Sequence, residues 1–280
     1  MMRQTQLTIQ GIRTPCLIGG KERTEAVLFL HGNPGSGNDW ETFLPSLSDF
    51  TYVVAPDMPG FGRAEKPDNF NYSIDGYKNH TELLLDKLKI EKVHLVLHDF
   101  GGAWGLAWAT EHPHRVASIT LINVGLLRNY RWHFFARLWR MPVVGELVMR
   151  IPNRLIFRTG LKIGNPRGLP KPYIDELINN FDRETKRAVL RLYRATDVQK
   201  INKELVDRTI SSLLPLDIDC LVIWGKHDVY VPSKYAAAQK EAFPNAEIIY
   251  FEDSGHWPFI DNPGRFNEVL VGFLKKVVSK

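Results

Sequence analysis

Short apolar runs, each separated from the next by a stretch of helical periodicity, constrain the fold of this chain most. Parallel strands that are covered on both faces appear as continuous runs of Val, Ile and Leu, whereas half-exposed strands alternate. The helix-period stretches supply the crossovers that parallel strands need. We therefore expect a doubly wound α/β fold. The expected strands are 26–30, 52–55, 93–97, 116–122, 220–224 and 247–251, and the expected helices are 74–88, 102–111, 233–243 and 264–277.

The strand rhythm stops between Leu127 and about Leu214, where the sequence is aromatic, rich in arginine and helical in pattern. Prolines punctuate this stretch at 142, 152, 166, 170 and 172. An inserted helical cap explains the break more simply than a second domain in series, because apolar strands resume after it. We predict a core domain made of residues 1–127 and 213–280, and a cap over residues 128–212.

The composition is that of an ordinary globular protein, with 44% hydrophobic and 24% charged residues in 280. The polar amino terminus has no signal-peptide pattern, and no window approaches the roughly 20 apolar residues of a membrane span. Two cysteines, Cys16 and Cys220, rule out a disulfide-rich scaffold and favour a reducing compartment. We expect a cytoplasmic monomer or homodimer without an integral membrane segment.

The net charge of +5 is too modest over this length to indicate a nucleic-acid partner. It is nevertheless uneven, since 15 basic and five acidic residues lie between Arg128 and Arg194. Solvated helix faces explain this basic cap, and it could also favour anionic surfaces or lipophilic substrates at a membrane face. No metal-ligand spacing and no complete phosphate-binding glycine loop occur, so we expect neither a metal nor a cofactor.

Polar, glycine-containing segments follow five of the expected strands, at the place where ligands gather in open parallel sheets. They are His31-Gly32-Asn33-Pro34-Gly35, Asp57-Met58-Pro59-Gly60-Phe61-Gly62, His98-Asp99-Phe100-Gly101-Gly102, Gly225-Lys226-His227-Asp228 and Ser254-Gly255-His256-Trp257. In the third segment Asp99 stands between a strand and a helix with small residues behind it, which is typical of a nucleophile elbow. The alternative is that Asp99 caps the helix.

Two further groups, Asp228 and His256, stand at matching strand ends. A histidine can deprotonate water, and a buried carboxylate on its other ring nitrogen fixes the tautomer. The five segments together resemble the α/β-hydrolase fold, in the branch with an aspartate nucleophile that contains epoxide hydrolases and haloalkane dehalogenases. The chain order of Asp99, Asp228 and His256 matches nucleophile, acid and base in that family.

This resemblance implies a mostly parallel eight-stranded sheet with helices on both faces and an inserted helical cap. It also implies a covalent alkyl ester on Asp99, hydrolysed by water that His256 activates with the help of Asp228. The residues expected around the reacting atoms, as oxyanion donors or substrate contacts, are Asn33, Phe100, His31 and Trp257. One departure from the family is Leu97, where many epoxide hydrolases have glycine, so the elbow geometry is expected to differ slightly.

The leaving group separates the two activities of this branch. An epoxide needs a proton donor, and epoxide hydrolases use two cap tyrosines for this purpose. By resemblance, Tyr193 and Tyr130 are the expected donors in this chain, and Tyr173 is a further candidate. The expected substrates are therefore a small lipophilic epoxide and water, and the product is a vicinal diol.

A halide instead needs N–H donors. Asn33 fits this need, but Phe100 has no side-chain N–H, so a haloalkane dehalogenase would depend on Trp104 or Trp132. A purely binding role is a third alternative, although all three catalytic positions are filled.

Overall fold

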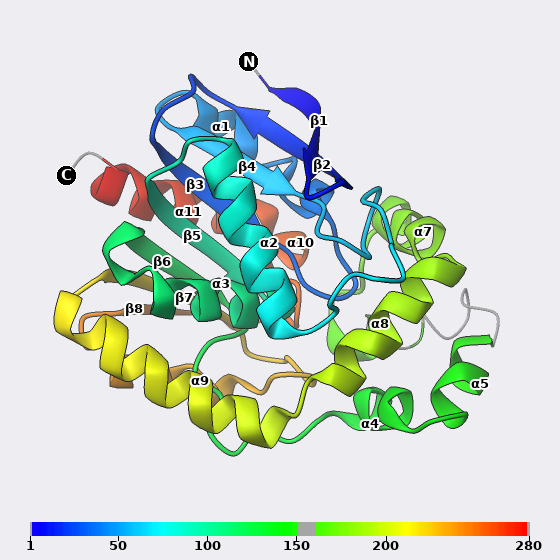
Figure 1. Ribbon diagram of the computed structural model, residues 1–280. Helices are drawn as coiled ribbons and strands as arrows, with labels where there is room; N and C mark the ends of the chain where they lie inside the picture. The colour runs from blue at the N-terminus through cyan, green and yellow to red at the C-terminus, as the bar shows by residue number, and fades with distance from the viewer. Residues whose placement is uncertain (1, 151–158, 160, 279–280) are drawn as a thin grey trace.

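An eight-stranded sheet lies at the centre of the computed structural model, which describes residues 2–150, 159 and 161–278 (Figure 1). The strand order is β1-β2-β4-β3-β5-β6-β7-β8. The strands are β1 (Arg3–Ile9), β2 (Ile12–Gly19), β3 (Glu25–Leu30), β4 (Tyr52–Pro56), β5 (Lys92–His98), β6 (Val116–Ile122), β7 (Asp219–Gly225) and β8 (Glu247–Phe251). β1 pairs antiparallel with β2, and β2 with β4, whereas the strands from β4 to β8 are parallel. The mostly parallel sheet is therefore confirmed.

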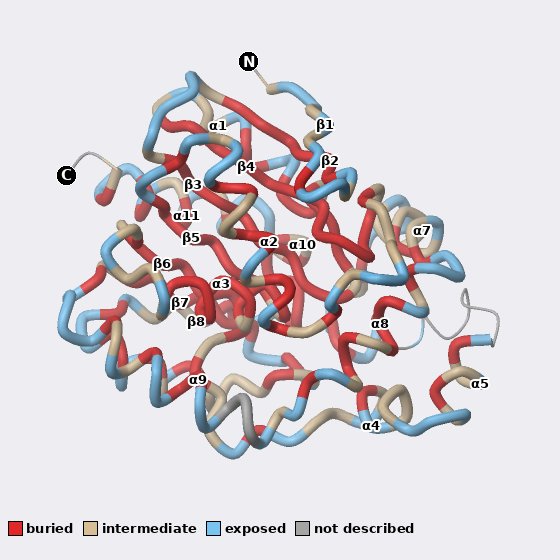
Figure 2. The backbone as a smooth tube through the Cα atoms, in the orientation of Figure 1, coloured by how far each residue is buried: buried red, intermediate tan, exposed pale blue. Residues whose placement is uncertain are grey.

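Two apolar cores lie on the two faces of this sheet, and the alternation along β3 shows how they form. Ala26, Leu28 and Leu30 belong to one core, while Val27 and Phe29 belong to the other. Successive side chains of a strand point to opposite faces, so a continuous apolar run supplies both cores. Figure 2 shows the inner strands of the sheet buried along most of their length, whereas the edge strand β1 is largely exposed.

Helices cover both faces. One core includes residues of α2 (Ile74–Lys87) and α3 (Phe100–Glu111), and the other includes residues of α1 (Leu44–Ser48) and α11 (Pro263–Val278). A short α10 (Pro258–Asp261) precedes α11. The expected helices 74–88, 102–111 and 264–277 are confirmed.

The expected helix 233–243 is wrong, because the structure has only the short 3₁₀ helices η4 (Ser233–Tyr235) and η5 (Ala237–Glu241) there. The buried side chain of Gln239 gives the reason. Its oxygen accepts from the Leu126 N–H at 2.7 Å, and its amide donates to the carbonyls of Tyr235 and Leu126 at 2.9 and 3.2 Å. Docking against the segment after β6 thus competes with regular helical hydrogen bonding.

Between β6 and β7 the described residues form helices and no strand. They are α4 (Phe134–Arg140), α5 (Val144–Arg150), α7 (Lys171–Asn180), α8 (Arg183–Ala195) and α9 (Val198–Leu213). Figure 1 shows α4, α5, α7 and α8 gathered at one end of the sheet, while α9 lies beside α3 of the core. The cap limits of 128 and 212 stay a prediction. No helix in the described ranges is long and apolar enough to cross a membrane.

Candidate active site

Asp99 stands on a strained turn between β5 and α3. Its backbone has φ 50° and ψ −124°, a conformation that residues other than glycine rarely adopt. The turn is possible because its neighbours are small: a Cβ atom on Gly32 would lie 2.3 Å from the Cβ of Asp99, and one on Gly101 would lie 2.3 Å from the Leu30 carbonyl oxygen. The sequence thus forms a sharp elbow that lifts one carboxylate above the sheet.

Leu97 fits this elbow through a compensating glycine. A Cβ atom on Gly105 would lie 2.4 Å from a methyl group of Leu97, so the leucine side chain occupies the space that a side chain on α3 would fill. Many epoxide hydrolases have a small residue at the position of Leu97; in this chain the small residue is Gly105 on α3, which faces Leu97.

The two oxygens of the Asp99 carboxylate have different partners. Oδ1 accepts a hydrogen bond of 2.8 Å from the backbone N–H of Asn33, and Oδ2 lies 3.5 Å from Nε2 of His256. Burial would raise the pKa of Asp99, but the His256 imidazole and the Asn33 N–H outweigh it and lower the pKa to about 2. Asp99 is therefore an anion with Oδ1 held and Oδ2 facing the histidine. Phe100, the second expected oxyanion donor, makes no backbone hydrogen bond to this carboxylate in the described ranges.

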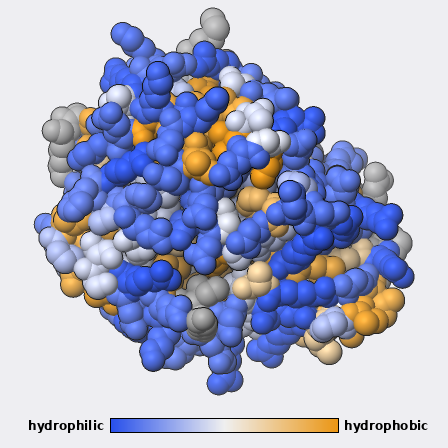
Figure 3. Space-filling model, viewed as in Figure 1, coloured by the Kyte–Doolittle hydropathy of each residue, from blue (hydrophilic) through white to orange (hydrophobic). Residues whose placement is uncertain are grey.

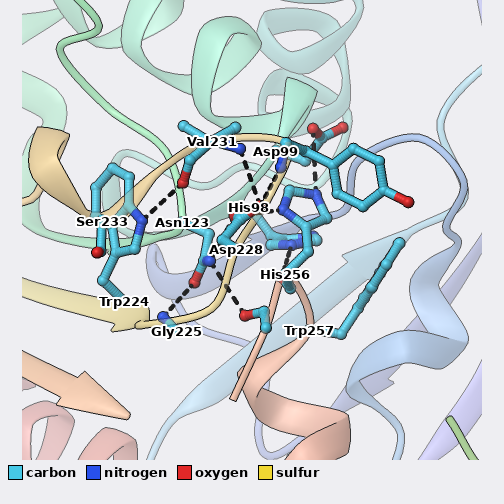
Figure 4. A network of polar contacts seen from close by, with 12 residues as sticks. His98, Asp99, Asn123, Trp224, Gly225, Asp228, Val231, Ser233, His256 and Trp257 are labelled. Atoms are coloured by element: carbon cyan, nitrogen blue, oxygen red, sulfur yellow. Dashed lines mark hydrogen bonds and ion pairs between the residues drawn. The ribbon is translucent and has the colours of Figure 1, made fainter. Parts of the chain in front are cut away.

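His256 and Asp228 form a short hydrogen bond, with 2.7 Å between Nδ1 and Oδ2 (Figure 4). Burial opposes a charged imidazole at this place, but Asp228 and then Asp99 raise the pKa of His256 above its ordinary value. Asp228 itself is held by the backbone N–H groups of Tyr230 and Val231, which donate to Oδ1 at 2.7 and 2.9 Å. The structure thus brings Asp99, His256 and Asp228 together.

Two residues of this network were missed by the sequence reasoning. The side-chain amide of Asn123 donates to Oδ2 of Asp228 at 2.6 Å, while its oxygen accepts from the Gly225 N–H at 3.0 Å. His98 bonds through Nε2 to the carbonyl oxygen of His256 at 2.9 Å. Burial, with the neighbouring His256, lowers the pKa of His98 to about 3, so its neutral ring donates this bond. Asn123 directly follows β6, so the signal that selected Asp99, a polar residue immediately after an expected strand, could also have identified Asn123.

Tyr193, on α8, reaches the nucleophile from the cap. Its hydroxyl accepts a hydrogen bond of 3.3 Å from the side-chain amide of Asn33, and its ring lies 5.0 Å from that of Phe100. Burial, and then the charge of Asp99, raise the pKa of Tyr193 well above its ordinary value. The group is therefore a neutral hydroxyl beside a carboxylate.

Tyr130 has a different environment. Its hydroxyl donates to the Tyr230 carbonyl oxygen at 3.0 Å and accepts from the backbone N–H of His133. Burial, with the nearby carboxylates, raises the pKa of Tyr130. The phenol therefore joins the start of the cap to the loop that holds Asp228. Its proton is engaged in the hydrogen bond to the Tyr230 carbonyl oxygen. Tyr173 donates to Asp39 Oδ1 at 3.2 Å and lines neither cavity at Asp99.

Two largely apolar cavities flank Asp99. Four residues line both: Asp99, His133, Tyr193 and Tyr230. Asn33, His256 and Trp257 line only the first, together with cap residues such as Phe135 and Trp139. Phe100, Tyr130 and Trp132 line the second. The nucleophile, the histidine and a cap tyrosine thus face a dry space suited to a small apolar molecule.

His31 does not belong to this space, contrary to the expectation. Its Nδ1 lies 2.8 Å from the Gly32 carbonyl oxygen, and its Nε2 accepts from the Met58 N–H at 3.0 Å. The ring is fully buried and lines neither cavity at Asp99. His31 therefore ties together the loops after β3 and β4 instead of contacting substrate.

His133 is a further polar group of the cavities that the sequence reasoning did not single out. Its Nδ1 accepts a hydrogen bond of 3.3 Å from the Ala136 N–H at the start of α4. Burial lowers the pKa of His133 to about 4, so the ring is neutral and its proton lies on Nε2. The helix cap thus fixes a histidine tautomer with an N–H donor beside Asp99.

An aspartate on a strand-to-helix elbow, facing a histidine and a second carboxylate at the ends of parallel strands, defines a hydrolase of α/β architecture. The described residues contain no cluster of three or more His, Cys, Asp or Glu that could hold a metal ion. The chain belongs to the α/β-hydrolase fold family, whose model, described as alpha/beta hydrolase fold, matches residues 25–263.

Similar proteins support this assignment. 2-Hydroxy-6-oxo-2,4-heptadienoate hydrolase of Pseudomonas putida is 39% identical over 256 residues, which cover 89% of this chain and 88% of that protein. The solved structure of epoxide hydrolase CorEH has a TM-score of 0.82 at 22% identity and covers 99% of both chains. That of haloalkane dehalogenase DbeA from Bradyrhizobium elkani has a TM-score of 0.85 at 21% identity, covering 100% of this chain and 99% of its own. The structural likenesses establish the fold.

Proposed function

We propose that this protein is an epoxide hydrolase that converts a small lipophilic epoxide into a vicinal diol. The observation that carries the proposal is the position of Tyr193, whose neutral hydroxyl lines the same apolar cavities as the Asp99 carboxylate. Ring opening needs a nucleophile on one side of the epoxide and a proton donor on the other. Asp99 and Tyr193 supply these two groups.

In the first half of the reaction, Oδ2 of Asp99 attacks a ring carbon while Oδ1 stays on the Asn33 N–H. The C–O bond breaks, its electron pair moves to the ring oxygen, and this oxygen takes the proton of Tyr193. The amide of Asn33, already bonded to the phenol oxygen, stabilises the tyrosinate that results. His133 donates a second hydrogen bond to the leaving oxygen through Nε2, which is the part that Tyr130 was expected to play.

In the second half, formation of the ester removes the negative charge of Asp99. This charge helps to raise the pKa of His256, so its loss returns the imidazole towards the neutral base. His256 then takes a proton from water, and the hydroxide attacks the ester carbon while the Asn33 N–H binds the oxyanion. Collapse of this intermediate expels an alkoxide, which takes the proton of the newly formed Asp99 carboxyl group and leaves as the diol. The proton on His256 then restores Tyr193.

A haloalkane dehalogenase is the second candidate, and one observation favours it. The indole N–H groups of Trp132 and Trp257 are buried without a partner in the described ranges, and each lines one of the cavities at Asp99. Either could hold a departing halide together with Asn33. Trp104, the other tryptophan considered for this task, lines neither cavity and stacks on Tyr77 instead.

A trapped ester distinguishes the two activities by mass. In a His256→Gln variant the first half-reaction proceeds and the ester persists, so intact-protein mass spectrometry reads the adduct. An epoxide adds its whole mass, whereas a haloalkane adds its mass less that of the hydrogen halide. We expect whole-mass adducts and, with the wild-type protein, diol release. Asp99→Asn in the same background is the control and should give no adduct.

The proposal is wrong if a broad epoxide panel gives neither adduct nor diol, and haloalkane adducts alone would establish the second candidate. Tight binding of the panel without turnover would instead support a receptor.

A further inference from the structure

The helical hairpin of α4 and α5, hereafter the cap hairpin (residues 134–150), exposes an unusual amount of apolar surface. Half of the exposed large hydrophobic side chains in the described part of the chain lie on it. They are Val143 (69% exposed), Phe134 (68%), Leu147 (55%) and Met141 (49%). Figure 3 shows hydrophobic side chains gathered over α4 and α5 on the outer face of the molecule. A contiguous apolar patch of this kind marks an interaction surface.

One side of α4 already has a partner, and the other has none that the described residues supply. Phe135 and Trp139 line the first cavity at Asp99, and Ala136 is fully buried. Phe134, the first residue of α4, and Met141, which directly follows the helix, are exposed instead and line neither cavity at Asp99. A helix that is apolar on two sides needs cover on both.

The turn into α5 presents Val143 in the same way. Its backbone has φ 68°, which a β-branched residue rarely adopts. The N–H of Leu147 donates to the Val143 carbonyl oxygen at 3.0 Å, so these two apolar side chains are one helical turn apart. The fold thus holds two large aliphatic groups in solvent through a strained turn, as strained backbones at functional surfaces do.

Charge on the cap hairpin narrows the choice of partner. Between residues 134 and 150 the sequence has three arginines and one acidic residue, Glu146. Arg194 neutralises Glu146 with two hydrogen bonds of 2.6 and 2.8 Å. Arg137 and Arg150 are exposed and lie three residues from Phe134 and Leu147, so cationic and apolar groups share the surface. A second copy of the chain would set these arginines against each other.

We propose that the cap hairpin docks this protein on the surface of an anionic lipid bilayer. Phe134, Val143 and Leu147 enter the boundary between head groups and acyl chains, and Arg137 and Arg150 meet the phosphates. The same helix lines the substrate cavity through Phe135 and Trp139. Docking therefore places one wall of that cavity against the phase in which lipophilic molecules concentrate.

Vesicle sedimentation tests this proposal without any substrate, so its outcome is independent of the epoxide hydrolase assay. Wild-type protein should bind phosphatidylcholine vesicles that contain about one third phosphatidylglycerol, bind pure phosphatidylcholine far less, and release at high salt. The double variant Val143→Glu/Leu147→Glu should lower the partition coefficient at least about tenfold. Arg137→Gln and Arg150→Gln should each lower it about fivefold.

The matched control is Leu216→Glu, which changes an exposed apolar residue outside the cap hairpin and should leave binding unchanged. Circular dichroism of each variant checks the fold, and the single variant Leu147→Glu replaces the double one if that fails to fold. Two results overturn the proposal. One is that wild type ignores anionic vesicles or binds them as the double variant does. The other is a dimer that the double variant dissociates, because a second copy would then cover the hairpin.

Discussion

The two cap tyrosines should respond in opposite ways to loss of their hydroxyl groups. In Tyr130→Phe, the Tyr230 carbonyl and the His133 N–H lose a buried partner. An unsatisfied buried group costs about 1–3 kcal/mol, so we expect the free energy of unfolding to fall by about 2 kcal/mol. For a chain of 280 residues, with an unfolding entropy of about 2.1 cal/mol/K per residue, that corresponds to a fall of about 3–4 °C in Tm.

Tyr193→Phe removes only the 3.3 Å bond from Asn33, a long contact at a cavity wall. Its stability should change by less than about 1 kcal/mol. Ring opening, in contrast, loses its proton donor, and general acid catalysis contributes about 10²–10⁴-fold. The variant should therefore form the Asp99 ester about 10²–10⁴ times more slowly, while Tyr130→Phe stays within about tenfold of the parent.

Two measurements on each variant compare the loss of stability with the loss of ring-opening rate. Calorimetry gives Tm, and rapid quench followed by mass spectrometry gives the rate of ester formation in a single turnover, in the His256→Gln background that retains the ester. The reasoning would be refuted if Tyr130→Phe slowed ester formation as much as Tyr193→Phe while leaving Tm unchanged. Tyr130 would then be the second proton donor that the family resemblance implies, and His133→Gln should leave ester formation unaffected.

Three further predictions concern packing, acid stability and thiol reactivity. Gly105→Ala should destabilise the protein by about 1–3 kcal/mol through the clash with Leu97, and Leu97→Ala in the same chain should recover part of this loss; additive effects in chemical denaturation would contradict the contact. Burial lowers the pKa of His80 to about 4 in the folded protein, so the stability that its neutral form provides is present above pH 6.5 and is lost as pH falls towards 4. The free energy of unfolding of His80→Gln, measured in urea, should therefore fall less steeply with decreasing pH than that of the wild type, and equal slopes would count against the argument. Cys16 and Cys220 are buried with raised pKa values, so a thiol reagent at pH 8 should find neither thiol in the native protein and both after unfolding; rapid labelling of the native protein would disprove this.

The sequence predicted the six parallel strands β3 to β8, because most of them form continuous apolar runs. It did not single out the antiparallel strands β1 and β2. The side chains of β1 are largely exposed and polar, as expected of an edge strand, and the apolar pattern of β2 is interrupted by Arg13, Thr14 and Pro15. The helix expected at 233–243 failed because the contacts of Gln239 with the segment after β6 override local periodicity. Those contacts join residues 113 positions apart, which a short window cannot represent.

In the site, too, the residues at strand ends could be predicted from the sequence, whereas the cap residues could not. Asp99, Asp228 and His256 were selected because each lies in a loop that follows a strand, and the sheet brings strand ends together. The cap residues follow no such rule. Tyr130 and His133 are three residues apart and both line a cavity at Asp99, and the packing of the segment before α4 determines that the Tyr130 hydroxyl donates to the Tyr230 carbonyl oxygen. Side-chain direction in an irregular segment depends on tertiary packing that sequence spacing does not describe.

The bonds around Asp228 limit how protons travel through this site. Its two oxygens together accept four hydrogen bonds, from Tyr230, Val231, Asn123 and His256, and a carboxylate has about four lone-pair positions. All four donors stabilise the anionic carboxylate, so the hydrogen on Nδ1 of His256 stays on the ring. The proton that His256 takes from water must therefore pass through Nε2 on the side of Asp99, and the rate of ester hydrolysis should fall linearly with the deuterium fraction of the solvent.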